Sequence, residues 1–259
     1  MPTDTWNPAQ YNLFQREREQ PFFDLLAGVV PRPDMRVVDL GCGTGRLTRL
    51  LHQRLHARET VGIDQSARML EGSADAALPG LRFEAGTIES FPDGRGRFDV
   101  IFSNAALHWV ADHEILISRL AEALTASGQL AFQVPAMHDN PSHMLATELA
   151  SEEPYAGALA GWHRPLHVLS PDAYARLLFR LGFADPKVEL IVYPHVLADA
   201  DAVVEWMKGT LLTDYARRLP DDLFAMFLAA YRRRLVEQLG SQTPFFFPFK
   251  RILCWGHRA

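Results

Sequence analysis

The sequence predicts an α/β fold in which helices flank a mostly parallel sheet of seven strands and insertions add a helical cap. Short apolar runs alternate with amphipathic helical patterns along most of the chain, and this alternation is typical of parallel strands joined by right-handed crossovers. The run 98–103 is nearly all apolar, as in a strand that is covered on both faces. The run before residue 41 leads into a glycine-rich turn and a further helical pattern, as open parallel sheets do at a ligand site.

Length and composition limit the fold and the partners. The 259 residues are 48% hydrophobic, which is enough for one α/β domain with insertions or with a small cap. A net charge of −5 and a pI of about 6.1 favour neither nucleic acid nor an anionic membrane as partner. Cys42 and Cys254 make no disulfide framework and match no metal spacing, and no leader or membrane-spanning run is visible. We therefore expect a cytoplasmic protein without a metal; its oligomeric state stays open, with a monomer favoured.

The first elements follow from capping and spacing. Asn7-Pro8 supplies a cap and a first-turn proline for a helix. One face of this helix has residues at spacings of three and four, namely Tyr11, Phe14 and Arg18. Pro21 interrupts or restarts the helix. Residues 36–40 form the first strand, and a helix after the glycines has leucines at core spacing, at Leu47, Leu50, Leu51 and Leu55.

Four more strands and two helices complete the first half. The strands are the apolar runs 60–63, 81–85, 98–103 and 129–134. Ser66 begins a short helix that carries Met69 and Leu70. A longer helix before the last of these strands is marked by Ile117, Leu120, Ala121 and Leu124.

After Pro135 the pattern changes. Residues 136–168 have few strand signals and many His, Pro, Trp and Tyr residues, which predicts an irregular or helical insertion. Apolar spacing then predicts a helix that carries Tyr174, Leu177, Leu178 and Leu181. The remaining elements are a strand at 187–193, helices at 201–215 and 221–239, and a closing strand at 249–256 that completes the sheet.

The most informative stretch is the turn Val37-Val38-Asp39-Leu40-Gly41-Cys42-Gly43-Thr44-Gly45-Arg46. Glycine reaches backbone angles closed to other residues and lets a ligand lie against the main chain, while the helix that follows points free N–H groups at the ligand. Asp64 ends the next strand, where an acid can accept hydrogen bonds from a ribose. Arg46 or Thr48 stands where a dinucleotide fingerprint needs its third glycine, and the lysine of a phosphate-binding loop is missing. The pattern favours an adenosine cofactor other than NAD or a nucleoside triphosphate, against the alternative of an ordinary turn.

With this turn, Asp64 and the segment 98–109 in the expected order, the first half resembles class I S-adenosylmethionine-dependent methyltransferases. The resemblance implies a Rossmann-like fold with S-adenosyl-L-methionine as cofactor and S-adenosyl-L-homocysteine as product. Nearly end to end, the chain is also similar to the trans-aconitate 2-methyltransferase family. That similarity rests on Trp6-Asn7-Pro8, Asn104-Ala105, Trp109-Val110, Gln133-Val134-Pro135, Pro141-Ser142-His143, the segment 203–210 and Phe247-Pro248-Phe249-Lys250-Arg251. It implies carboxyl O-methylation of a small organic acid.

The expected division of the chain follows from these patterns and this resemblance. A helical lid segment occupies 1–30 and the cofactor-binding core 31–135. The cap and substrate insertions occupy 136–168 and 199–240, and the core sheet is completed by 169–198 and 241–259.

The resemblance also implies a set of cofactor contacts. Gly41, Gly43 and Gly45 allow close backbone approach, with Cys42 in the same turn. The amino acid end of the cofactor is expected at Asp39 and Arg18, and the ribose at Asp64. Adenine would lie between Met69 and Ile88 with Thr87 at its edge. The remaining expected contacts are Tyr11, Gln65, Asn104 and Ala105, the last two beneath the methyl group.

The acceptor site is expected at the carboxyl end of the fourth strand, where His108 and Trp109 would position the substrate. A carboxylate acceptor is already ionised at neutral pH, so no catalytic base is predicted. A histidine base would be needed only for a hydroxyl or amine acceptor. Further substrate candidates are Trp162, His163, Arg164, Tyr193, His195, Trp206, Lys208, Tyr215 and Arg251.

The chain departs from the family pattern at three places. Thr87 replaces an Asp, Thr44 and Arg46 replace Pro and Asn, and Thr213-Asp214 stands where the family has Arg-Pro. The last change removes an expected cation for a substrate carboxylate and sets an acid beside the gap. Two alternatives therefore stay open: a methyltransferase of the same fold that acts on a malonyl carrier protein or a specialised metabolite, and a catalytically silent cofactor-binding protein.

Overall fold

The computed structural model describes residues 15–76, 78–91 and 96–258. The helix start predicted at Asn7-Pro8, with Tyr11 and Phe14, lies outside these residues, and the side chain of Arg18 is likewise not described. Within the described ranges, no helix combines the length and the apolar character needed to cross a bilayer.

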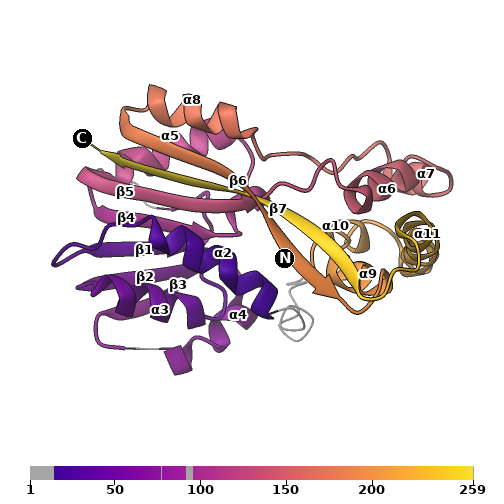
Figure 1. Ribbon diagram of the computed structural model, residues 1–259, viewed down its shortest axis with the longest axis horizontal. Coiled ribbons are helices and arrows are strands. Elements are labelled where there is room, and N and C mark those ends of the chain that lie inside the picture. Colours follow the sequence, from indigo (N-terminus) through magenta and orange to yellow (C-terminus); the bar gives the residue numbers. More distant parts are fainter. Residues whose placement is uncertain (1–14, 77, 92–95, 259) are drawn as a thin grey trace.

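A seven-stranded sheet forms the centre of the molecule (Figure 1). Its strand order is β3-β2-β1-β4-β5-β7-β6. Strand β7 runs antiparallel to the other six strands, which are parallel to one another. The strands are β1 (Arg36–Leu40), β2 (Glu59–Asp64), β3 (Leu81–Ala85), β4 (Phe98–Asn104), β5 (Leu124–Pro135), β6 (Phe183–Leu197) and β7 (Phe245–Arg258). The predicted α/β class is confirmed.

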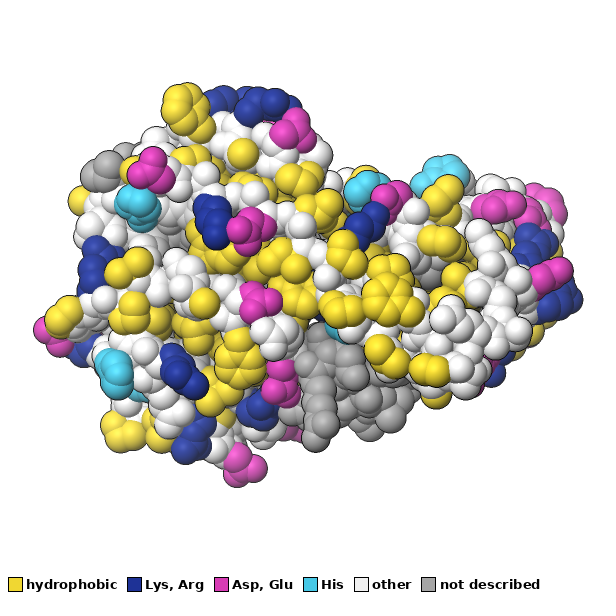
Figure 2. Space-filling view, viewed as in Figure 1, with side chains coloured by type: hydrophobic (Ala, Val, Ile, Leu, Met, Phe, Trp, Pro, Cys, Tyr) yellow, Lys and Arg dark blue, Asp and Glu magenta, His cyan; other side chains and the backbone are white. Residues whose placement is uncertain are grey.

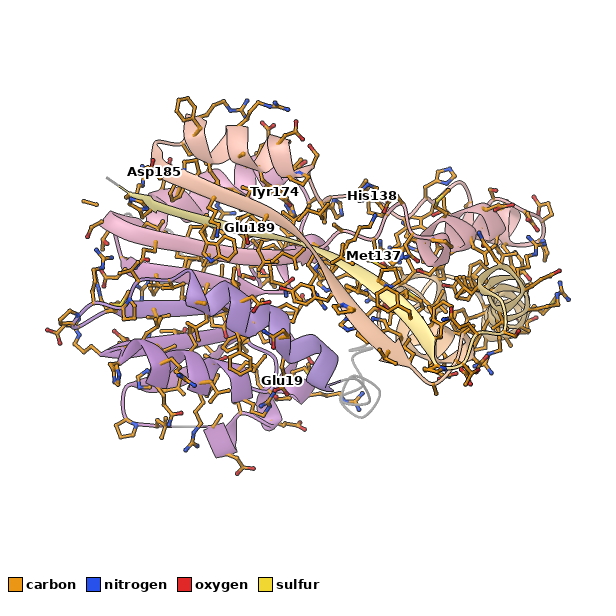
Figure 3. The ribbon with its side chains drawn as sticks, in the orientation of Figure 1. Glu19, Met137, His138, Tyr174, Asp185 and Glu189 are labelled. Carbon is orange, nitrogen blue, oxygen red and sulfur yellow. The ribbon has the colours of Figure 1, made fainter. Side chains whose placement is uncertain are left out.

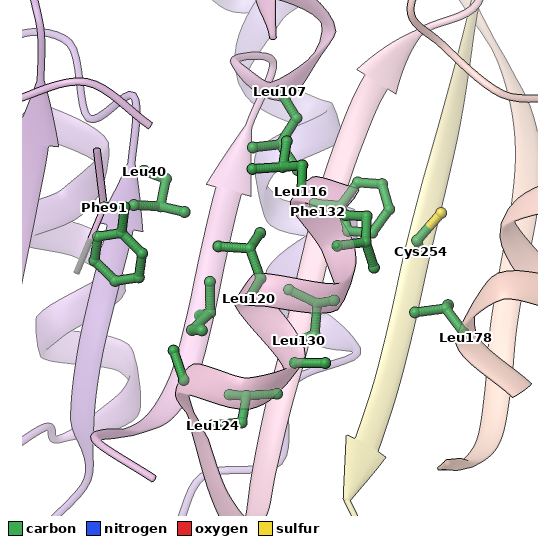
Figure 4. Close-up of a cluster of buried hydrophobic side chains, with 14 of the residues drawn as sticks. Leu40, Phe91, Leu107, Leu116, Leu120, Leu124, Leu130, Phe132, Leu178 and Cys254 are labelled. Carbon is green, nitrogen blue, oxygen red and sulfur yellow. The ribbon is translucent and has the colours of Figure 1, made fainter. Parts of the chain in front are cut away.

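Helices cover both faces of this sheet (Figure 1). On one face α2 (Gln15–Ala27) and α3 (Arg46–Leu55) bury Phe22 and Leu51 against the strands. On the other face α5 (His113–Ala123) and α8 (Pro171–Arg180) do the same; Figure 4 shows Leu120 and Leu178 in this cluster. Short helices lie at the carboxyl ends of the strands: α4 (Ala67–Glu71), η1 (Ala74–Ala76) and η2 (Leu107–Trp109). The apolar spacing of the sequence therefore marks the faces that pack on the sheet.

A helical cap is joined to the sheet by the long strands β6 and β7, which continue beyond their neighbours (Figure 1). Its helices are α6 (Pro141–Ala150), α7 (Tyr155–Leu159), α9 (Asp201–Lys208), α10 (Thr213–Ala216) and α11 (Asp221–Leu239). They enclose a separate apolar cluster around Phe227 and Tyr231, to which the outer ends of the ribbon add Leu197 and Phe247. This cluster draws on both predicted insertions; the division into lid, core and cap stays a prediction.

The outer face of the β6–β7 ribbon is apolar. Figure 2 shows hydrophobic side chains gathered over the middle of this view, where the ribbon leaves the sheet. The exposed large hydrophobic side chains on the two strands are Leu190, Val192, Val196 and Phe246. Both strands are longer than the predicted 187–193 and 249–256, because β6 and β7 stay paired into the cap, where alternate residues of both strands are buried.

Three local predictions are wrong. Helix α2 runs through Pro21 without a break, because Phe22 and Leu25 are fully buried and their packing outweighs the cost of the proline. Leu124 opens β5 rather than closing α5; its side chain is buried in either case, so periodicity does not distinguish the two. The single helix predicted at 201–215 is two helices, since the chain breaks at Gly209, the C-cap of α9.

Candidate functional site

The glycine-rich turn lies between β1 and α3. Gly41 has φ +76°, and a Cβ there would stand 2.2 Å from the Cβ of Ala106, so only glycine fits. The N–H groups of Gly41 and Cys42 both donate to the carbonyl of Ile63, at 2.8 and 3.0 Å. These bonds hold the turn against the end of β2 and fix the shape of the backbone there.

Asp64 fastens this turn from the neighbouring strand. Its Oδ2 accepts a hydrogen bond of 2.8 Å from the N–H of Gly43, and its Oδ1 accepts one of 2.9 Å from the N–H of Ser66. A carboxylate has about four lone-pair sites, so both oxygens keep acceptor capacity after these bonds. The half-buried Asp64 is thus a fixed acceptor at the edge of the turn, as ribose hydroxyls require.

Asp39 lies deeper in the same place. Its Oδ2 accepts a hydrogen bond of 2.6 Å from the hydroxyl of Thr48, while Oδ1 is buried and has no hydrogen-bond partner within the described part of the chain. Burial raises the pKa of this carboxyl to about 7, and the nearby charge of Asp64 adds to the effect. A buried acceptor without a donor is rare in native proteins. Asp39 therefore fits a positively charged donor such as the ammonium group of S-adenosylmethionine.

A cavity of about 430 Å³ opens in front of the turn. It brings together most of the predicted cofactor contacts: Asp39, Gly41, Cys42, Gly43, Asp64, Gln65, Met69, Ile88, Asn104 and Ala105. Burial raises the pKa of the Cys42 thiol, so this side chain stays a neutral wall. Glu19 of α2, labelled in Figure 3, also lines the cavity, and it pairs with Arg46. Sequence reasoning missed Glu19, because no local motif surrounds it.

Two predicted cofactor residues lie outside this lining. Gly45 precedes α3, where a Cβ would meet the ring of Phe83 at 2.5 Å; its missing side chain lets helix and strand approach closely. The hydroxyl of Thr87 accepts from the N–H of Ser90 at 3.1 Å and also bonds the Ser90 hydroxyl. Its neighbours Gly86 and Ile88 do line the cavity. Contact of Thr87 with adenine stays a prediction.

The wall of the cavity opposite the turn is made by η2 and the cap. Of the predicted substrate residues, His108, Trp109 and Trp162 lie there. The wall also carries Arg164, Arg217 and Arg218. Sequence reasoning named Arg164 of the 136–168 insertion among the substrate candidates, but it missed Arg217 and Arg218. Arg217 and Arg218 directly follow α10, and such an adjacent basic pair beside a predicted cap helix was the available signal.

The carboxylate of Asp214 does not neutralise the positive charge of this wall. Asp214 accepts from Nε of Arg164 at 3.1 Å and lies 3.7 Å from Arg218. Arg218 also lies over the ring of Trp162 at 4.0 Å, and Arg164 over Trp109 at 5.8 Å. Among the described residues Arg217 forms no ion pair. The wall therefore carries arginines from elsewhere in the chain although position 213 holds no cation.

Two histidines near this wall, His108 and His143, are held neutral. The pKa of His108 lies well below its usual range, first because of burial and then because Arg164 and Arg251 are close. Burial also lowers the pKa of His143 to about 3, and the nearby charge of Arg164 lowers it further. Within the described chain, Nδ1 of His108 is buried without a hydrogen-bond partner. These two histidines therefore add no positive charge to that of the guanidinium groups.

The other substrate candidates lie away from the cavity lining. His195 stacks on Trp206 at 5.0 Å between ring centroids, and Tyr215 stacks on Phe227 at 4.9 Å, all within the cap core. Lys208 pairs with Glu205 at 2.8 Å. Their aromatic and basic character thus serves the packing of the cap.

Tyr193 and His163 are also not part of the lining. The hydroxyl of Tyr193 donates to Oδ2 of Asp24 at 2.8 Å and ties β6 to α2, and its pKa is raised by burial. His163 is exposed on the cap surface, next to the cavity residues Trp162 and Arg164.

Arg251 reaches the site through other side chains. It is 4% exposed, and its Nη1 donates to Oε1 of Gln133 at 3.1 Å. Nε2 of Gln133 in turn donates to Oδ1 of Asn104 at 2.7 Å, and Asn104 lines the cavity. Sequence reasoning placed Arg251 at the substrate and did not foresee Gln133 between them.

Comparisons with known proteins agree with this geometry. A family profile described as "Methyltransferase domain" matches residues 14–188. The chain is 44% identical over 255 residues to a trans-aconitate 2-methyltransferase of Deinococcus radiodurans, with 96% of each chain covered. It is 43% identical over 239 residues to a protein of the same name from Variovorax paradoxus, with 92% of each covered.

Solved structures share the fold at lower sequence identity. The YcgJ protein of Bacillus subtilis has a TM-score of 0.63 at 19% identity, covering 93% of this chain and 98% of its own. An S-adenosylmethionine-dependent methyltransferase of Mesorhizobium loti has a TM-score of 0.53 at 22% identity, covering 93% and 98%. The chain belongs to the methyltransferase domain family and, within it, to the family of the trans-aconitate 2-methyltransferases.

Proposed function

We propose that this chain methylates one carboxylate of a small tricarboxylic acid of the trans-aconitate type. One observation carries the proposal: a single cavity has two acids, the buried Asp39 and the half-buried Asp64, beside the glycine turn on one wall and three arginines of the cap on another. The first wall suits a cofactor with a positive charge and ribose hydroxyls. The second suits a polyanion.

The cofactor wall presents acceptors at fixed places. S-adenosylmethionine, when bound, supplies a methyl group on a positively charged sulfur. Asp39 would accept from the ammonium group through its unpartnered Oδ1, and Asp64 would accept from the ribose hydroxyls. Met69 and Ile88 offer apolar contact for a flat base. Each of these contacts aligns the cofactor with the opposite wall without reacting itself.

The cap wall matches the charge of the acceptor. This wall has three guanidinium groups, those of Arg164, Arg217 and Arg218, and the one carboxylate of Asp214. Its formal net charge is therefore two positive charges. A tricarboxylate that turns one carboxylate toward the sulfonium has two further carboxylates to place. Arginine binds such groups with two parallel hydrogen bonds and stays charged at any pH of interest. The charge count therefore supports an acid with two carboxylates beyond the one that reacts.

The reaction needs no proton transfer from the protein. An ordinary carboxyl has a pKa near 4 and is ionised at neutral pH, so its oxygen is already a nucleophile. The protein has to align the two groups and remove water between them, which contributes up to roughly 7–11 kcal/mol in well-oriented systems. His108 and Trp109 form an apolar and neutral wall at this point, their rings 4.7 Å apart. The neutral state of His108 fits a positioning role.

The test is methylation in vitro with radiolabelled S-adenosylmethionine. With trans-aconitate we expect label in a methyl ester that base hydrolysis releases. A monocarboxylic acid of the same chain length is the control and should accept little label. Label only in a base-stable ether or amine, or only on a malonyl carrier protein, would contradict the proposal. Cofactor binding without turnover over a panel of di- and tricarboxylic acids would favour a silent binding protein.

We also infer that the enzyme acts as a cytoplasmic monomer. Its two cysteines, Cys42 and Cys254, are buried and unlinked, as is usual for proteins of reducing compartments. Light scattering after gel filtration tests the monomer, and a dimer at micromolar concentration would contradict it.

A further inference from the structure

Three polar side chains on adjacent strands form a row that ends at the cavity. Arg251 of β7 donates to Gln133 of β5 at 3.1 Å, and Gln133 donates to Asn104 of β4 at 2.7 Å. Asn104 and Gln133 are register partners in the parallel pair β4–β5, and Arg251 pairs two residues further along β5. Gln133 is fully buried and Arg251 is 4% exposed, whereas Asn104 lines the cavity.

The arginine fixes the direction of every bond in this row. A guanidinium group has donors only, so the amide of Gln133 must turn its oxygen toward Arg251 and its NH₂ toward Asn104. One lone pair of the Asn104 oxygen is then taken by Gln133. The NH₂ group of Asn104 is the donor left for a ligand. Burial of Gln133 makes the opposite orientation costly, because it would leave two donors facing each other.

We propose that this row makes Asn104 a hydrogen-bond donor to the reacting carboxylate, with Gln133 and Arg251 as positioning residues. The inference rests on the proposed function. The ammonium and hydroxyl groups of the cofactor are donors and are matched by the acids Asp39 and Asp64. The acceptor acid is an anion and needs donors, and Asn104 ends the strand that leads into the wall of His108 and Trp109.

The row also has an electrostatic advantage over a cation at the same place. A guanidinium group in contact with the reacting carboxylate would stand next to the positive sulfur of the cofactor and repel it. Two amides connect Arg251 to the cavity, so its preference for donation is passed on without a guanidinium group in contact with the reacting carboxylate. Hydrogen bonds in such a chain polarise one another, which strengthens the last donor.

Gln133→Glu tests the proposal, because it keeps the shape of the side chain and reverses its hydrogen bonding. A glutamate pairs with Arg251 and can only accept from Asn104, so the amide of Asn104 turns its oxygen toward the cavity. We expect kcat/KM for the tricarboxylic acid to fall roughly 10- to 100-fold, the range of one hydrogen bond to a charged group. The dissociation constant of S-adenosylmethionine should change less than about twofold.

Two further variants separate positioning from folding. In an Asn104→Ala background, Gln133→Glu should add no further loss in kcat/KM, since the group that it turns is gone. Gln129→Glu is the matched control: Gln129 lies on the same strand, is 7% exposed and bonds both the N–H and the C=O of Val30, at the other end of the sheet. It should lower the melting temperature and leave kcat/KM of the folded enzyme unchanged.

The outcomes distinguish this inference from the proposed function. If the wild type methylates the acid and Gln133→Glu leaves its kinetics unchanged, the inference fails and the function stands. If Gln133→Glu lowers kcat/KM equally in the wild type and in the Asn104→Ala background, the role of Gln133 is structural only. A loss in cofactor affinity in place of acid kinetics would assign Asn104 to the cofactor. A wild type that methylates no tricarboxylic acid would overturn both.

Discussion

Asp39 is expected to destabilise the folded protein when it is charged, so Asp39→Asn should stabilise it at alkaline pH. The carboxyl is 3% exposed, and burial raises its pKa from 3.8 to about 7. Between these two values the folded chain binds a proton that the unfolded chain has released. The free energy of unfolding therefore falls as the pH rises from about 4 to about 7 and stays low above that. Asparagine keeps an acceptor for the hydroxyl of Thr48 and has no charge to bury.

The two pKa values give the magnitude. With 3.8 in the unfolded chain and about 7 in the folded one, ionisation of Asp39 costs about 2 kcal/mol at pH 5 and about 4 kcal/mol at pH 8. The wild type should thus lose about 2 to 3 kcal/mol between pH 5 and pH 8 that the Asp39→Asn variant keeps. Charges elsewhere titrate equally in both proteins and cancel in the comparison.

Urea unfolding followed by circular dichroism, without cofactor, at pH 5 and pH 8 measures this difference. The control is Asp99→Asn at the other end of the sheet, where the carboxylate accepts from the N–H of Arg36 and the hydroxyl of Thr125 and faces the Arg36 guanidinium. This control should give no stabilisation at pH 8. The reasoning is refuted if Asp39→Asn lowers stability at pH 8, or if the variant differs from the wild type equally at both pH values.

Three further outcomes are expected. Asp64→Ala should weaken S-adenosylmethionine binding roughly 10- to 100-fold in calorimetry, because the ribose loses a charged acceptor; unchanged affinity would place the ribose elsewhere. Arg217→Ala should raise KM for the tricarboxylic acid about tenfold with cofactor affinity unchanged, and a parallel change in both would contradict its assignment. Phe227→Ala should cost about 3–5 kcal/mol in urea unfolding, since Phe227 is fully buried between Tyr215 and Tyr231; a loss below about 1 kcal/mol would show that the cap unfolds separately.

Most of the fold was predictable because the apolar pattern within each segment shows which of its side chains are buried. The strands 36–40 and 81–85 and the helix 221–239 have the predicted bounds, since their apolar pattern ends at turn or capping residues. The errors at Leu124 and at Gly209 share one cause. Leu124 is buried at helical spacing from Leu120, and Met207 and Leu211 are buried at helical spacing on either side of Gly209, so the pattern does not show where the backbone changes direction.

The cofactor side of the candidate site was predictable from the sequence, whereas Arg217 and Arg218 of the cap wall were not. The glycine turn and Asp64 are local features, and the structure brings ten of the predicted cofactor residues to one cavity. The cations of the cap wall come from positions 164, 217 and 218, and no motif links them. His195 and Trp206 looked equally suited to a ligand by residue type, yet they stack on each other inside the cap.

By itself, the sequence determined the α/β class, the turn that holds an adenosine cofactor and the acid at the end of β2, because strand, turn and helix signals act over a few residues. Only the tertiary structure decided which side chains face the acceptor. Arg164 and Arg217 meet at one wall, and Arg251 reaches Asn104 through Gln133, because helices and strands far apart in the chain pack together there. Burial and hydrogen-bond direction arise from that packing, so residue type alone does not assign them.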